Sequence, residues 1–120
     1  MSDPRSLLGK TILVLEDEPL IAFDIERALA IAGATVILCA VATEALEIVR
    51  SGPIDCGVLD INLPDGTCYK VADQLRKQGT PFLFTTGYEQ VRADFADVPI
   101  FKKPFDLEAL VRMVARMTAP

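Results

Sequence analysis

The chain has 120 residues, 51% of them hydrophobic, which is the size of one domain with enough apolar material for one buried core. Its net charge of −5 and the even scatter of its lysines and arginines argue against direct binding of nucleic acid. Because the chain has no histidine, a serine–histidine dyad, a histidine-ligated metal and a phosphohistidine of its own are all excluded.

The sequence contains no run of about 18 apolar residues and begins without the apolar segment of a signal peptide. We therefore predict a cytoplasmic protein without membrane association. Its cysteines, Cys39, Cys56 and Cys68, are odd in number and lack C-x-x-C spacing. We predict that they are free thiols in a reducing compartment and form neither a disulfide nor a zinc site.

Apolar strand-like runs alternate with amphipathic helical patterns along the chain. The first strand is predicted at 11–15, and the first helix at 19–32, with proline in its first turn and Gly33 as its stop. The other predicted strands are 35–40, 56–61, 82–86 and 98–101. The other predicted helices are 42–50, a helix that follows a turn at 63–66 and ends near residue 78, and 107–117.

Strands that are apolar on both faces and alternate with helices are typical of a parallel sheet covered on both sides. The pattern predicts an α/β fold of the flavodoxin-like, doubly wound kind, whose ligands bind beyond the carboxyl ends of the strands. Residues 87–96 carry few apolar side chains, so the fourth helix is predicted to be short or mobile. We expect one domain over residues 1–120, with no output domain in the chain.

Polar residues follow the predicted strands at the points where the strands end. Glu16 and Asp17 follow the first strand, Asp60 closes the third, Thr86 ends the fourth and Lys103 follows the fifth. Because the carboxyl ends of parallel strands meet at one edge, we predict a pocket that combines three carboxylates, a hydroxyl and an ammonium. Such a set is suited to moving a phosphoryl group onto an aspartate carboxylate.

Neighbouring carboxylates of Asp17 and Asp60 would repel by about 4 kcal/mol at a separation of about 4 Å and an effective dielectric constant of about 20. A cation is needed to offset this repulsion, and hard oxygen ligands without cysteine or histidine favour Mg²⁺. Lys103 is either a donor to the phosphoryl group or a structural ion-pair partner of Asp17 or Asp60. Pro104 permits a cis peptide bond that would turn the lysine side chain into the pocket.

These motifs resemble the receiver domain of two-component response regulators over nearly the whole chain. The matching stretches are 12–19 (ILVLEDEP), 59–66 (LDINLPDG), 86–87 (TG) and 102–105 (KKPF). The resemblance implies the strand order 2-1-3-4-5, with strands numbered along the chain, and a CheY-like fold. It also implies that Asp60 is the phosphoacceptor and that Thr86 and Lys103 contact the phosphoryl group. The implied Mg²⁺ ligands are the side chains of Asp17 and Asp60, the backbone carbonyl of Asn62, and Glu16 through water.

Two departures from the family pattern matter. Ile100 stands where typical receivers have an aromatic residue three positions before the lysine, so the usual threonine–aromatic switch cannot operate. Residues 81–88 resemble the Phe-Ala-Thr-Gly-Tyr signature of the FAT GUY class of alphaproteobacterial single-domain receivers, with Thr85 at the alanine position. That class has a shortened fourth helical region. Our hypothesis is that signalling orders residues 87–97, with movement of Tyr88.

The resemblance implies a stand-alone receiver that takes a phosphoryl group from a sensor histidine kinase or phosphotransfer protein and then binds a downstream protein. Such a chain catalyses its own phosphorylation and dephosphorylation and is not otherwise an enzyme. Two alternatives remain open: a phosphate sink or shuttle in a phosphorelay, and an unphosphorylated interaction module. A haloacid-dehalogenase phosphatase is disfavoured because Asn62 replaces the second aspartate. A flavin carrier is disfavoured because the loop after the first strand lacks phosphate-cradling glycines.

Two helices offer candidate partner surfaces. Leu20, Phe23 and Ile31 fall off the core stripe of the first helix. They either pack beneath neighbouring elements or form a docking face for the helical phosphotransfer domain of a kinase, as in receivers generally. The last helix is predicted to leave Met113 beside its arginines as a dimer or effector contact. Its predicted buried residues are Leu107, Leu110, Val111, Val114 and Met117.

Overall fold

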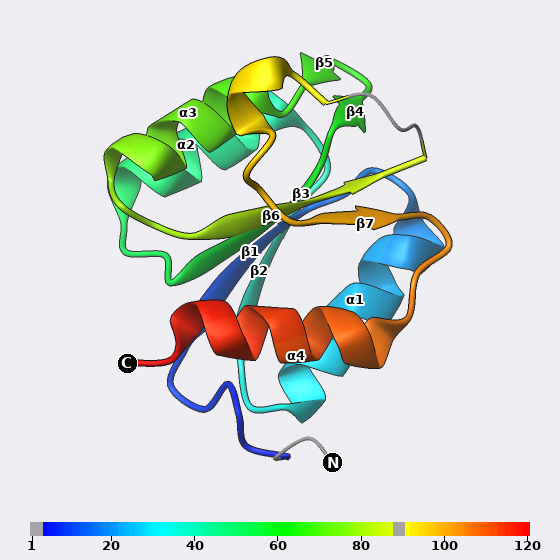
Figure 1. Cartoon of the computed structure of the whole chain (residues 1–120), viewed down its shortest axis with the longest axis vertical. Helices are drawn as coiled ribbons and strands as arrows, with labels where there is room; N and C mark the ends of the chain where they lie inside the picture. Colours follow the sequence, from blue (N-terminus) through cyan, green and yellow to red (C-terminus); the bar gives the residue numbers. More distant parts are fainter. Residues whose placement is uncertain (1–3, 88–90) are drawn as a thin grey trace.

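The computed structural model describes residues 4–87 and 91–120, and it contains a five-stranded parallel sheet with helices on both faces (Figure 1). The strands stand in the order β2-β1-β3-β6-β7. This is the predicted order 2-1-3-4-5, because β4 and β5 form a separate two-stranded hairpin. The bounds are β1 Thr11–Leu15, β2 Thr35–Cys39, β3 Cys56–Asp60, β4 Asn62–Leu63, β5 Gly66–Thr67, β6 Phe82–Thr86 and β7 Ile100–Lys102.

Helices α1 (Pro19–Ile31) and α4 (Leu107–Thr118) cover one face of the sheet, and α2 (Ala42–Ser51) and α3 (Tyr69–Lys77) cover the other (Figure 1). Each face has its own cluster of buried apolar side chains, as expected for strands that are apolar on both sides. After α1, Gly33 has a φ of 105°, and a Cβ there would lie 3.0 Å from the backbone of Leu8. Glycine therefore ends α1 for both conformational and steric reasons.

Two predicted boundaries differ from the structure. The last strand begins at Ile100 rather than at residue 98, because the Val98 N–H donates to the Phe95 carbonyl in the preceding turn, 3.0 Å away. The predicted turn at 63–66 forms the tip of the β4–β5 hairpin. Its strands are two residues long and largely exposed, so they leave no alternating pattern in the sequence.

The fourth helical unit is reduced to a 3₁₀ turn, η1 (Ala93–Phe95), which confirms the prediction of a short helix within residues 87–96 for the part that the structure describes. Phe95 is fully buried, and its ring stacks on Tyr69 with the centroids 5.7 Å apart. The Arg92 guanidinium lies 4.7 Å from the Phe95 ring centre and 4.8 Å from that of Tyr69. Tyr88, to which the switching hypothesis assigned a movement, lies outside the described residues.

Replacing Arg92 by alanine is expected to loosen η1 without unfolding the domain. Arg92 forms exposed ion pairs with Asp73 (2.8 Å) and Asp94 (2.7 Å) in addition to its ring contacts. We expect amide exchange at Phe95 and Val98 to accelerate by roughly two- to fivefold, the range expected for an exposed cation–π contact. Hydrogen exchange followed by NMR measures this, with Arg50→Ala at the exposed end of α2 as the control. Equal exchange in the two variants would contradict an anchoring role for Arg92.

The outward face of α1 carries exposed apolar side chains. Leu20, Phe23 and Ile31 are 81%, 55% and 68% exposed, so the first of the two alternatives, that they pack beneath neighbouring elements, is wrong. On α4, the prediction that Met113 is left on the outside needs correction. Met113 packs partly buried against the core between the sheet and helices α1 and α4, because the buried face of α4 is wider than the predicted stripe. Leu107 and Met117, which were predicted to be buried, are only partly buried as well.

The three cysteines are buried free thiols, as predicted, and burial raises the pKa of each of them to about 12. They are therefore protonated and unreactive at neutral pH. Across residues 4–87 and 91–120, none of the helices has the length and apolar character needed to cross a membrane.

Candidate functional site

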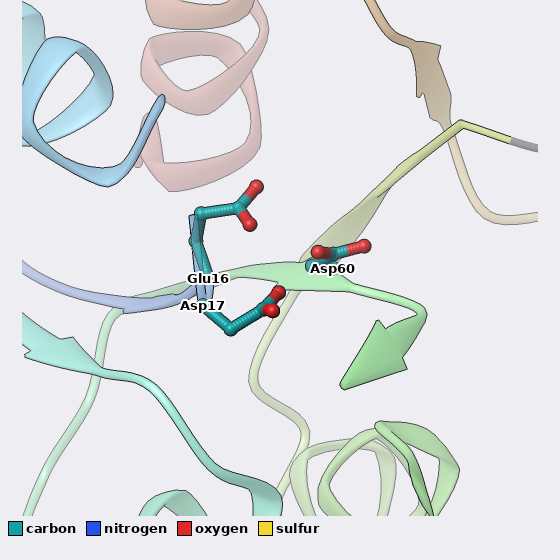
Figure 2. Close-up of side chains that lie close together, drawn as sticks. All are labelled: Glu16, Asp17 and Asp60. Atoms are coloured by element: carbon teal, nitrogen blue, oxygen red, sulfur yellow. The ribbon is translucent and has the colours of Figure 1, made fainter. Parts of the chain in front are cut away.

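The predicted acidic residues meet at the carboxyl edge of the sheet. Glu16 and Asp17 follow β1, Asp60 ends β3, and Figure 2 shows their side chains grouped at this edge. One carboxylate oxygen from each of the three lies within 4.8 Å of the others. Glu16 and Asp60 are only 2% and 3% exposed, and Asp17 is half-buried. The parallel sheet thus brings two buried carboxyl groups and one half-buried carboxyl group together.

Backbone hydrogen bonds between strand ends hold these residues in place. The Glu16 N–H donates to the Cys39 carbonyl at the end of β2, 2.9 Å away. The Lys103 N–H donates to the carbonyl of Thr86, the last residue of β6, over 2.8 Å. Thr86 is fully buried there. The alignment of the strand ends therefore sets the positions of the site residues, as the sequence predicted.

Lys103 supplies the positive charge of the site. Its Nζ lies 2.8 Å from Glu16 Oε1, 3.1 Å from Asp60 Oδ2 and 3.4 Å from Glu18 Oε1. Of the two ion-pair partners considered for Lys103, Asp17 and Asp60, the structure shows the pair with Asp60, whereas Glu16 and Glu18 were not foreseen as partners. The Lys103–Pro104 peptide bond is cis. Because only 14% of the lysine side chain is exposed, its ammonium is committed to the carboxylates.

The surroundings of the three carboxyl groups make it unfavourable for all of them to be ionised at once. Burial, reinforced by the neighbouring Glu16, raises the pKa of Asp60 from 3.8 to about 7, although Lys103 opposes the shift. Burial alone would lower the pKa of Lys103, but its ion pairs with Glu16 and Asp60 outweigh that effect and raise it. At neutral pH the site therefore favours an additional cation or a proton.

The donor set fits Mg²⁺. Three carboxylates converge, and this cluster contains neither histidine nor cysteine, so hard oxygen donors dominate. Asn62, whose backbone carbonyl is a further ligand implied by the resemblance, begins β4 two residues after Asp60. That ligand, and the role of Glu16 through water, stay predictions from the sequence.

Thr85 has an unusual environment for a polar residue. It is 1% exposed, and within the described part of the chain its hydroxyl has no hydrogen-bond partner. Thr85→Val keeps the shape and removes the unpaired group, so we expect the free energy of unfolding to rise by about 1 kcal/mol. Urea denaturation measures the change. A clear loss of stability would instead indicate that a buried water satisfies the hydroxyl.

Residues 12–115 match the family model described as the response regulator receiver domain. The transcriptional regulatory protein TcrA of Mycobacterium tuberculosis is 36% identical over 109 residues, which cover 85% of this chain and 43% of TcrA. The response regulator MprA of Mycobacterium ulcerans is 35% identical over 115 residues, covering 90% and 48% of the two chains. This chain spans about half the length of these curated relatives.

Solved structures give the same picture of the fold. The solution structure of SdrG from Sphingomonas melonis Fr1 superposes with a TM-score of 0.79 at 35% identity, covering 98% of both chains. A CheY-like receiver domain from Methanospirillum hungatei gives a TM-score of 0.82 at 22% identity, covering 91% of this chain and 93% of that one. The second match is evidence for the fold alone.

Proposed function

The chain belongs to the response regulator receiver domain family, and from this premise we propose that Asp60 accepts a phosphoryl group in a Mg²⁺-dependent reaction. The observation that carries the proposal is the position of Asp60. Its carboxylate is buried beside Glu16 and Asp17, with the Lys103 ammonium 3.1 Å away. The donor is a phosphohistidine on a sensor histidine kinase or phosphotransfer protein.

In the transfer, an Asp60 carboxylate oxygen attacks the phosphorus of the partner's phosphohistidine. An O–P bond forms, the P–N bond breaks, and the imidazole leaves with the electron pair and takes up a proton. Lys103 and Thr86 donate to the phosphoryl oxygens, where the charge of the transferring group resides. Bound by Glu16, Asp17, Asp60 and the Asn62 carbonyl, Mg²⁺ would supply positive charge against these carboxylates and the incoming oxygens.

The surfaces of the fold support an assignment of partners. Leu20, Phe23 and Ile31 form an exposed apolar strip on α1, which we assign to the kinase or phosphotransfer protein. We assign the side of the domain that carries α4 to contact with a second copy of the chain or with a downstream protein. Ile100 is 41% exposed on β7, which fits a switch that does not depend on an inward-turning aromatic residue at this position. The proposal includes a cytoplasmic location and catalysis limited to the chain's own phosphorylation and dephosphorylation.

Intact mass spectrometry tests the proposed function. After incubation with Mg²⁺ and acetyl phosphate, the protein should gain the mass of one phosphoryl group, and EDTA should prevent the gain. If neither acetyl phosphate nor a panel of phosphorylated histidine kinases produced the mass shift, the chain would be an unphosphorylated interaction module instead.

A further inference from the structure

The first turn of α2 is capped by a residue from another segment of the chain. Val41 stands at the N-cap position, and its side chain makes no capping hydrogen bond. The Ala42 and Thr43 N–H groups donate instead to Asp65, over 3.0 Å to Oδ1 and 3.2 Å to Oδ2. These bonds hold the pKa of Asp65 below its usual range, Ala42 contributing most. The carboxylate of Asp65 thus joins two segments more than 20 residues apart.

Asp65 lies at the tip of the β4–β5 hairpin, three residues after Asn62. A two-stranded hairpin is marginal without outside contacts, and this one is mostly exposed, with Leu63 partly buried against the core. At its base, the Cys68 N–H donates to the Ile61 carbonyl over 3.1 Å. The contact with α2 therefore fixes the far end of a hairpin whose near end begins next to Asp60.

The α2 end of this contact is tied to the acidic site as well. Cys39 accepts from the Glu16 N–H over 2.9 Å and lies three residues before Ala42. Glu16, Asp17 and Val41 line the same groove, which has a volume of about 490 Å³. The end of β1 is thus hydrogen-bonded to the end of β2, which leads along the chain into α2. The start of α2 in turn contacts the hairpin that follows Asp60. Asp65 makes this last contact through its side chain.

We propose that Asp65 is a positioning residue for the metal site, which fixes the Asn62 backbone carbonyl relative to Asp17 and Asp60. This inference rests on the proposed function, because it assumes that the Asn62 carbonyl is a Mg²⁺ ligand. Loss of the Asp65 carboxylate leaves every proposed ligand chemically intact but frees the hairpin that carries one of them. Mg²⁺ affinity should then fall although the acidic residues are unchanged.

The test is calorimetric titration of each purified protein with MgCl₂. Substitution of residues that orient metal ligands costs tenfold or more in affinity, so we expect Asp65→Ala to raise the Mg²⁺ dissociation constant about tenfold. Asp65→Asn keeps one acceptor oxygen and should fall between Asp65→Ala and the wild type. Asp55→Ala is the matched control, because Asp55 also accepts from a backbone N–H, that of Thr11 at 2.7 Å, at the opposite end of β1.

A second variant separates positioning from simple helix capping. Val41 has the extended backbone of an N-cap residue, so Val41→Ser can cap α2 without the hairpin. In Asp65→Ala/Val41→Ser, stability towards urea should recover while Mg²⁺ affinity stays low. Recovery of both, or a dissociation constant for Asp65→Ala no higher than that for Asp55→Ala, would overturn the positioning role but leave the proposed function intact. A wild-type chain that does not bind Mg²⁺ would overturn both.

Discussion

The Asp60→Asn protein is expected to gain no phosphoryl group from acetyl phosphate and, in metal-free buffer at pH 8, to be more stable than the wild type. Loss of phosphorylation follows because the asparagine amide is not a nucleophile comparable to a carboxylate. Glu16 is also buried and contacts Lys103, but the proposed function assigns the acceptor role to Asp60 at the end of β3. We expect the mass shift to disappear entirely rather than to decrease.

The gain in stability follows from the raised pKa of Asp60. Its pKa is about 7 in the folded chain and 3.8 as an ordinary carboxyl group, so between these pH values the folded state binds more protons than the unfolded state. The contribution of Asp60 to stability therefore decreases as the pH rises from about 4 to about 7 and then levels off. Asparagine resembles the protonated carboxyl at every pH, so Asp60→Asn should be more stable by up to about 4 kcal/mol at pH 8.

Urea denaturation in EDTA at a series of pH values measures both parts of the stability prediction. The difference between Asp60→Asn and the wild type should shrink as the pH falls towards 4. Asp24→Asn, which removes an exposed carboxylate on α1, serves as the control and should show little change. Equal stability of Asp60→Asn and the wild type at pH 8 would contradict the conclusion that burial and the neighbouring Glu16 make the ionised Asp60 side chain unfavourable in the folded protein. Added Mg²⁺ should stabilise the wild type more than the variant.

Much of the site could be predicted because the side chains that form it stand at the ends of buried strands. Asp60 interrupts an apolar run, and a parallel sheet leaves such a residue at only one edge. The register of β1 with β3, in which Leu15 pairs with Leu59, then brings Glu16 and Asp60 together. The alternation of apolar strands with helices, together with the place where each strand ends, therefore predicts on which edge of the sheet these side chains lie.

The contacts that the sequence did not predict involve loops and long-range partners. Asp65 caps a helix that begins 23 residues earlier, and no local spacing indicates such a pair. Glu18 was singled out for no role in the stretch 12–19, and its contact with Lys103 depends on how the segment after β7 turns back. For the same reason Phe95, which anchors η1, could not be distinguished from an exposed loop residue. These positions depend on tertiary packing and carry no periodic signal.

Replacing Lys103 by methionine is expected to destabilise the metal-free protein strongly. The Glu16 and Asp60 side chains are only 1% and 5% exposed, and the ammonium contacts both. Removing one partner of a buried ion pair typically costs 3–5 kcal/mol, because the other charge stays buried without compensation; we expect about 3 kcal/mol at pH 8. The loss should be smaller at pH 5, since Asp60, with its pKa of about 7, is then protonated.

Denaturation curves for Lys103→Met, with and without Mg²⁺, decide whether the lysine acts through its charge. The cation should stabilise this variant more than the wild type, because Mg²⁺ no longer shares the carboxylates with an ammonium. Lys102→Met on the exposed side of β7 is the matched control and should lose much less stability. If Lys103→Met were as stable as Lys102→Met at pH 8 in EDTA, the negative charges of Glu16 and Asp60 would be compensated by a group other than the Lys103 ammonium. The ammonium could then not be the charge that holds the unphosphorylated site together.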